Sequence, residues 1–259
     1  MMPTLSVSRW FGVSVVLALL AAGCVMDPAV SEHQREAKIR LAEAFILDSK
    51  PRAALFELLD AEKKWPRDAQ VQFLLGLAYE GLAQLELARG HYENALSLRP
   101  GYSQARNNLA VVLIKEGRYD QAIAHLKRVE ADLLYATPHF AAANLAWAYY
   151  QSGQPQLAEK YYRAVLEHYQ KGFTKDPTYV RTLANLGRLL LDQQRPAEAL
   201  EHLNTAAMVA DLPEIHFERG RAYLALGDRA NARQAFGRAQ DLSPKSAIGQ
   251  KAKAAMDAL

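Results

Sequence analysis

Small and large hydrophobic residues recur with one long period over most of the chain. Alanines mark this period at intervals of 34, 34, 36, 41 and 33 residues: Ala54, Ala88, Ala122, Ala158, Ala199 and Ala232. Twelve residues before each alanine stands another small residue: Ala42, Gly76, Ala110, Ala146, Gly187 and Gly220. Four residues after it stands a large one: Leu58, Tyr92, Leu126, Tyr162, Leu203 and Phe236. This period is typical of stacked helix pairs rather than of one globular core.

The spacing resembles the tetratricopeptide repeat, with its W-x2-L-G-x2-Y…A-x3-F-x2-A…P pattern. The resemblance implies an all-α fold, a right-handed superhelical solenoid of about six helix pairs with a C-terminal capping helix. Small residues let two antiparallel helices approach closely, and the large residues fill the space beside them. Because one pair cannot bury its own apolar face, we expect neighbouring pairs to stack into a continuous core.

We expect six repeats over residues 35–246 and a capping helix over 247–259. The predicted repeats are 35–68, 69–102, 103–138, 139–179, 180–212 and 213–246. Repeat four is seven residues longer than the 34-residue period (41 minus 34), with the extra residues around Tyr169–Lys175. Arg219 stands where the repeat has an apolar residue, so we expect it to lie along the last groove or to extend its charged end into solvent.

The first 23 residues have the pattern of a signal peptide. Arg9 precedes an apolar run over residues 10–22 that is too short to be a comfortable membrane span. The only cysteine of the chain, Cys24, follows directly after Gly23. The sequence Leu20-Ala21-Ala22-Gly23-Cys24 resembles the bacterial lipoprotein box, although Ala21 stands where that box usually has leucine. The resemblance implies cleavage before Cys24, lipidation of Cys24 with palmitate-type chains, and a tether over 24–34.

Two alternatives for this leader are an ordinary signal peptide cleaved nearby and an uncleaved anchor. A secreted chain with a single cysteine cannot form an internal disulfide, so the thiol needs another explanation. Val25 follows the cysteine, where an aspartate would signal retention in bacteria that use the aspartate rule. The resemblance therefore implies a location on the periplasmic face of the bacterial outer membrane.

Composition and motifs argue against nucleic-acid binding and against catalysis. The formal charge of +3 is too small to indicate a nucleic-acid partner. The sequence has no H-E-x-x-H, glycine-rich phosphate loop or G-x-S-x-G motif. Histidines are scattered without ligand spacing over different repeats, at His33, His91, His125, His139, His168, His202 and His216. We therefore expect neither an enzyme, nor a cofactor, nor a metal site.

The sequence predicts a partner-binding groove on the first helices of repeats three to five. The sixth position of these repeats is asparagine in each case, at Asn108, Asn144 and Asn185. An amide offers both a donor and an acceptor, so such a ladder can bind the backbone of an extended peptide. Aromatic and cationic side chains that are typical of binding hot spots lie beside it: Trp147, Tyr150, Arg181 and Arg188. The alternatives are that each asparagine bonds a neighbouring helix and that Trp147 fills the core.

Three segments resemble the PilF/PilW-type lipoproteins, six-repeat outer-membrane lipoproteins of type IV pilus biogenesis. They are Asp132–Pro138, with the sequence DLLYATP, Ala143–Tyr150, with ANLAWAYY, and Ala158–Tyr162, with AEKYY. The resemblance implies a pilotin, a lipoprotein that binds the outer-membrane secretin subunit and promotes its localisation or assembly without covalent chemistry. Two alternatives are a periplasmic scaffold for peptidoglycan enzymes and a tight-adherence pilus assembly lipoprotein.

Overall fold

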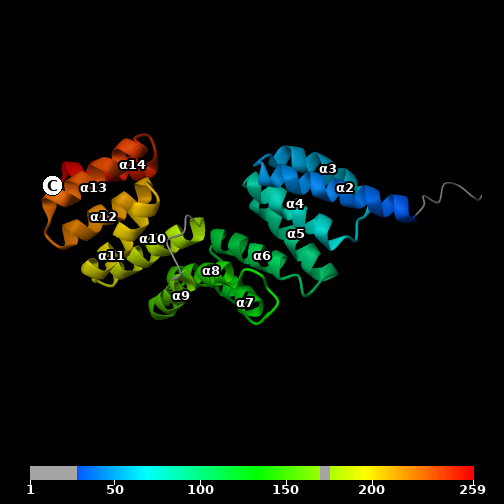
Figure 1. Cartoon of the computed structure of the whole chain (residues 1–259), viewed down its shortest axis with the longest axis horizontal. Helices are drawn as coiled ribbons and strands as arrows, with labels where there is room; N and C mark the ends of the chain where they lie inside the picture. The colour runs from blue at the N-terminus through cyan, green and yellow to red at the C-terminus, as the bar shows by residue number, and fades with distance from the viewer. Residues whose placement is uncertain (1–27, 170–175) are drawn as a thin grey trace, which may run out of the picture.

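The computed structural model describes residues 28–169 and 176–259, so the predicted signal peptide and Cys24 lie outside the described residues. Thirteen α-helices cover these two ranges, and each packs mainly against its neighbours in sequence. The helices form an elongated arch in which α6, α8 and α10 lie on the inner side and α7, α9 and α11 on the outer side (Figure 1). The predicted all-α array of helix pairs is confirmed.

Each repeat contributes two antiparallel helices. The helices are α2 (Pro28–Leu47), α3 (Pro51–Lys64), α4 (Ala69–Gly81), α5 (Leu85–Leu98), α6 (Ser103–Lys115), α7 (Tyr119–Glu130), α8 (Pro138–Gln151), α9 (Pro155–His168), α10 (Pro177–Asp192), α11 (Pro196–Val209), α12 (Pro213–Ala225), α13 (Arg229–Leu242) and α14 (Ala247–Asp257). Proline begins seven of them, where its missing N–H leaves no helical hydrogen bond unmade.

Close contact between the two helices of a repeat depends on the small residue of the first helix. A Cβ atom on Gly76 would lie 2.4 Å from the Tyr92 ring, and one on Gly220 would lie 2.5 Å from the Phe236 ring. Tyr92 and Phe236 are themselves almost fully buried. The small and large positions of the pattern therefore contact each other directly, within the same repeat.

The turns inside the repeats share one backbone conformation. Gly117, Gly153 and Gly227 have φ between 75° and 79°, a left-handed conformation that glycine adopts without steric cost. The corresponding turns of repeats one, two and five contain a residue with a side chain at φ 56–59°: Ser49, Ala83 and Gln194. The same reversal is thus made in all six repeats, and in three of them it is strained.

The expected tether over 24–34 is wrong from residue 28 onward, because α2 begins at Pro28. Side-chain contacts hold the extra helical turns. Trp65 donates from Nε1 to Ser31 Oγ at 3.3 Å, and Arg35 pairs with Asp68 at 2.6 Å. The repeat pattern does not predict these contacts. The first helix is therefore longer than the pattern predicts.

Two repeats begin earlier than predicted. Helix α8 begins at Pro138, one residue before the predicted start of repeat four. Helix α10 begins at Pro177, three residues before the predicted start of repeat five. The Asp176 side chain accepts a hydrogen bond from the Thr178 amide at 2.7 Å, which caps α10 and fixes its start.

Arg219 stands at a position that is apolar in the repeat pattern, and its guanidinium still makes polar contacts there. Its Nε donates to Asn204 Oδ1 at 2.8 Å, and its guanidinium lies 5.9 Å from the centre of the Tyr223 ring. The half-buried side chain therefore reaches from α12 back to α11 of the preceding repeat. None of the helices in the described part of the chain is long and apolar enough to cross a membrane.

Candidate functional site

A pocket of about 300 Å³ is lined mainly by residues of α6, α8 and α10, the first helices of repeats three, four and five. These helices lie on the inner side of the arch (Figure 1). We call this pocket the groove pocket. It is lined by Val111, Ile114, Lys115, Ala143, Asn144, Trp147, Tyr162, Arg181, Thr182, Asn185 and Arg188. Five of the seven predicted partner-binding residues line it, and Asn108 and Tyr150 do not. Residues as far apart in the sequence as Val111 and Arg188 thus meet in one hollow, because each helix pair stacks directly on the next.

The asparagines form a hydrogen-bonded chain that includes a residue the sequence analysis missed. Asn144 donates from Nδ2 to Asn107 Oδ1 at 3.1 Å, and Asn107 donates to Asn108 Oδ1 at 3.2 Å. Asn107 is 7% exposed. The alternative of a bond to a neighbouring helix is therefore correct for Asn144. Its Oδ1 atom accepts no hydrogen bond within the described residues, so it is available to a ligand.

Trp147 and Tyr150 form an aromatic wall at one end of the groove pocket. Their ring centres lie 5.4 Å apart with the planes tilted by 36°. Trp147 packs partly against the core and also lines the pocket. The Tyr150 hydroxyl donates to Asp192 Oδ2, and burial together with this carboxylate raises the pKa of Tyr150 to about 12. Tyr150 therefore supports Trp147 from outside the pocket.

Two of the residues that line the groove pocket, Tyr162 and Thr182, carry buried hydroxyl groups. Tyr162 and Thr182 are each 1% exposed. Neither Tyr162 Oη nor Thr182 Oγ1 has a hydrogen bond of good geometry within the described residues. Burial raises the pKa of Tyr162 far above its usual value, so its hydroxyl stays protonated. Unpaired buried hydroxyls are costly, and a bound polar group or water offsets that cost.

The cations of the groove pocket differ in how well they are paired. Arg188 donates from Nε to Glu218 at 2.8 Å, and Lys115 pairs with Glu80 at 2.7 Å. Arg181 is exposed and makes no ion pair or side-chain hydrogen bond with any residue that the structure describes. The charge of Arg181 is therefore uncompensated, and the pocket favours a ligand with an acidic group at that position.

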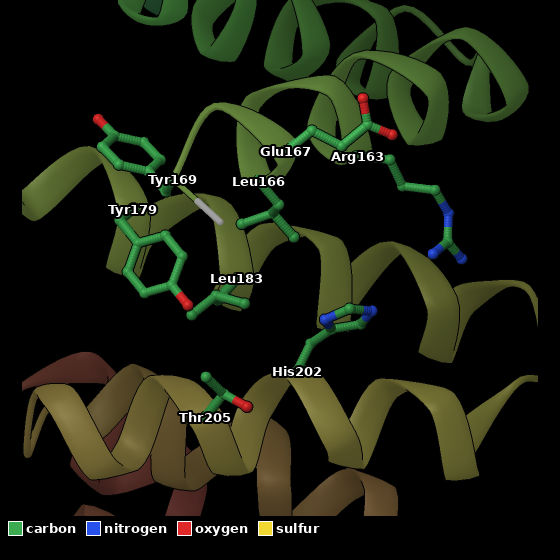
Figure 2. Close-up of a pocket in the computed structure, with 8 residues that line it drawn as sticks. All are labelled: Arg163, Leu166, Glu167, Tyr169, Tyr179, Leu183, His202 and Thr205. Carbon is green, nitrogen blue, oxygen red and sulfur yellow. The ribbon is translucent and has the colours of Figure 1, made fainter. Parts of the chain in front are cut away.

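A second hollow, of about 350 Å³, lies on the outer side of the array between α9, α10 and α11 (Figure 2). Figure 2 shows Tyr169 and Tyr179 at one end and Arg163 with His202 at the other. The two tyrosine rings are 5.3 Å apart in an edge-to-face arrangement, and burial lowers the pKa of His202. Tyr169, which lines this hollow, is the last described residue before residues 170–175.

Two histidines that are distant in sequence come together between α8 and α9, the two helices of repeat four. The rings of His139 and His168 are stacked with centres 4.4 Å apart, and burial together with His168 lowers the pKa of His139. Sequence spacing had placed these residues 29 positions apart, without a motif. Within residues 28–169 and 176–259, no three histidine, cysteine or acidic residues are arranged to hold a metal ion.

Three family models match this chain, each described as a tetratricopeptide repeat. They match residues 81–133, 139–208 and 184–247. The chain is a tetratricopeptide repeat protein. Tetratricopeptide arrays are protein-binding scaffolds, and no enzyme family is among these models.

Solved structures of tetratricopeptide proteins are similar to this one over most of its length. Pseudomonas aeruginosa PilF is 20% identical with a TM-score of 0.72, and the match covers 86% of this chain and 98% of PilF. PilW, a widely conserved type IV pilus biogenesis factor, is 21% identical with a TM-score of 0.74, covering 84% and 97%. YrrB, which has an unusual peptide-binding site, is 18% identical with a TM-score of 0.54, covering 76% and 97%. At these sequence identities the similarity shows a shared fold and nothing more.

Proposed function

We propose that this tetratricopeptide protein is a lipid-anchored outer-membrane protein that binds the type IV pilus secretin and promotes its localisation or assembly. The groove pocket is the observation that carries the proposal. It presents an uncompensated arginine, amide groups and an aromatic wall from three successive repeats. An extended protein segment with an acidic and an apolar residue matches these groups.

Similarity of fold to PilF and PilW supports the choice of partner. Both matches cover more than four fifths of this chain and nearly all of the other chain. The DLLYATP segment of this chain, Asp132–Pro138, supports it too. In this mechanism the acyl chains hold one end of the array at the membrane, and the groove pocket captures the secretin. Anchoring raises the effective concentration of the two proteins, so no covalent step is needed.

Titration with the periplasmic part of the secretin from the same organism tests the groove pocket. We expect Trp147→Ala to weaken binding more than tenfold, since a buried aromatic anchor contributes about 2 kcal/mol or more. The pair Asn144→Ala and Asn185→Ala is expected to weaken binding about thirtyfold, at roughly 1 kcal/mol for each amide.

Matched controls separate the pocket from general damage. Trp65→Phe changes a tryptophan in repeat one that lies against Ser31. Asn94→Ala with Asn204→Ala removes two amides from second helices, outside the pocket. The controls are expected to bind like the wild type. Wild-type affinity in both pocket variants, with circular dichroism unchanged, moves the binding surface elsewhere, and a wild type that does not bind refutes the secretin as partner.

The lipid anchor is tested separately at Cys24. Metabolic labelling with an alkyne analogue of palmitate is expected to mark the wild type and not Cys24→Ala. Two acyl chains are enough for stable membrane attachment, so Cys24→Ala is also expected to leave the membrane fraction. Equal labelling of the two proteins contradicts the anchor while leaving the groove pocket untouched.

A further inference from the structure

Helix α12 carries a buried carboxylate beside the groove. Glu218 is 4% exposed, although it stands at the sixth position of its repeat, in line with the asparagines. One carboxylate oxygen accepts from Arg188 Nε at 2.8 Å, and the other accepts from Arg221 Nη1 at 2.7 Å. A buried carboxylate is stable only when paired and hydrogen-bonded in this way. Glu218 therefore holds two guanidinium groups in fixed positions.

The second guanidinium continues the network back toward repeat four. Arg221 donates from Nη2 to Asp192 Oδ1 at 3.1 Å. The other oxygen of Asp192 accepts the hydrogen bond of the Tyr150 hydroxyl, and the Tyr150 ring packs on Trp147. An unbroken chain of contacts thus runs from repeat six to the aromatic wall of the groove pocket.

We infer that Glu218 is a positioning residue of the groove pocket. Its carboxylate holds Arg188 in the pocket wall and, through Arg221 and Asp192, holds Tyr150 against Trp147. This role rests on the proposed function of the pocket as a binding site. Glu218 does not line the pocket. One arm of its network ends on Arg188, which does, and the other reaches the lining residue Trp147 through the Tyr150 ring. Repeat six therefore sets the shape of a surface to which it contributes no direct contact.

A purely stabilising role is the competing explanation. The side chains of Arg221 and Asp192 are 38% and 42% exposed, and ion pairs at such positions contribute little to stability. The outer arm of the network is therefore better suited to orienting side chains than to stabilising the fold. A long arginine without its partner samples many rotamers, and fixing it beforehand lowers the entropy cost of binding.

The first test needs no ligand. Replacing Trp10 and Trp65 by phenylalanine in the full-length chain leaves Trp147 as the only tryptophan. In detergent, Glu218→Gln and Asp192→Asn are each expected to raise the acrylamide quenching constant of Trp147, because Tyr150 no longer stays against it. The matched control is Asp211→Asn. Asp211 pairs with His216 and Arg238 at the same repeat junction, away from the groove pocket, so this change is expected to leave quenching unchanged.

The second test measures binding of the secretin fragment. Glu218→Gln is expected to weaken binding roughly tenfold, the loss typical of one hydrogen bond to a charged group. In an Arg188→Ala background the same change is expected to cost much less, because both act on one contact. A wild type that fails to bind refutes the proposed function, and the quenching result then still decides the positioning role. Unchanged Trp147 quenching in folded Glu218→Gln and Asp192→Asn overturns the inference, even if Glu218→Gln lowers the urea midpoint.

Discussion

The contact between Gly76 and Tyr92 offers the sharpest test of how the repeats are packed. In Gly76→Ala, the new methyl group would lie 2.4 Å and 2.5 Å from two ring atoms of Tyr92. Tyr92 has no exposed surface, and its hydroxyl donates to Glu80 at 2.9 Å, so the ring has no free space to move into. The two helices of repeat two must therefore separate, or the ring must leave its rotamer.

Two opposing effects set the size of the change. Overpacking of a filled core costs about 1–3 kcal/mol. Alanine is favoured over glycine inside a helix by about 1 kcal/mol. The balance for Gly76→Ala is a loss of up to about 2 kcal/mol, with the steric cost exceeding the helix gain. Gly90→Ala in α5 of the same repeat provides the matched control, because nothing lies within 4 Å of its new Cβ. It is expected to gain up to about 1 kcal/mol.

Urea unfolding followed by circular dichroism at the helix band measures both variants. The midpoint is expected to fall for Gly76→Ala and to rise for Gly90→Ala, and the difference between them isolates the steric cost. Adding Tyr92→Leu to Gly76→Ala recreates the alanine and leucine pair of repeats one and three, and should recover most of the loss. Equal midpoints for the two single variants would refute the close contact between the helices.

Three further predictions concern the turns, the pH response and the middle of the array. Ala83→Gly should raise the urea midpoint. It relieves about 1–2 kcal/mol of strain from the left-handed backbone at this residue, and it costs about 0.5–1 kcal/mol in chain entropy. An unchanged midpoint contradicts the strain. Burial lowers the pKa of four histidines in the folded chain: His91, His125, His139 and His202. Their ordinary pKa in the unfolded chain is about 6.5, so the unfolded chain binds more protons than the folded chain as the pH falls through this value. The free energy of unfolding should therefore decrease from pH 7.5 to pH 5. Equal urea midpoints at the two pH values contradict this. Ala122→Leu should cost about 1–3 kcal/mol, because Ala122 is fully buried; a wild-type midpoint contradicts that contact.

The helix pairs were predictable because their packing repeats with the sequence. Gly220 and Phe236 contact each other through the same spacing that Gly76 and Tyr92 use, so one pattern describes every repeat. The start of α2 was not predictable in this way. It depends on a contact between Trp65 and Ser31, which occurs once and has no counterpart in other repeats.

The groove pocket was predictable in part because equivalent positions of successive repeats lie side by side. The sixth position placed Asn144 and Asn185 on one wall, and the structure brings both into the pocket. The bond from Asn144 to Asn107 and the burial of Glu218 were missed, because they depend on side-chain distances between neighbouring repeats. The stacking of His139 on His168 depends likewise on a side-chain distance, here between the two helices of repeat four.

The groove pocket draws its walls from three successive repeats, and this makes its width a measure of the curvature of the whole array. No single rigid element spans the hollow, so a slight rotation at either of the two joints moves Arg181 relative to Val111. Small rotations between successive repeats add along a solenoid and set its overall curvature. A ligand that bridges the pocket therefore stiffens the arch, and a force that flattens the arch loosens the ligand.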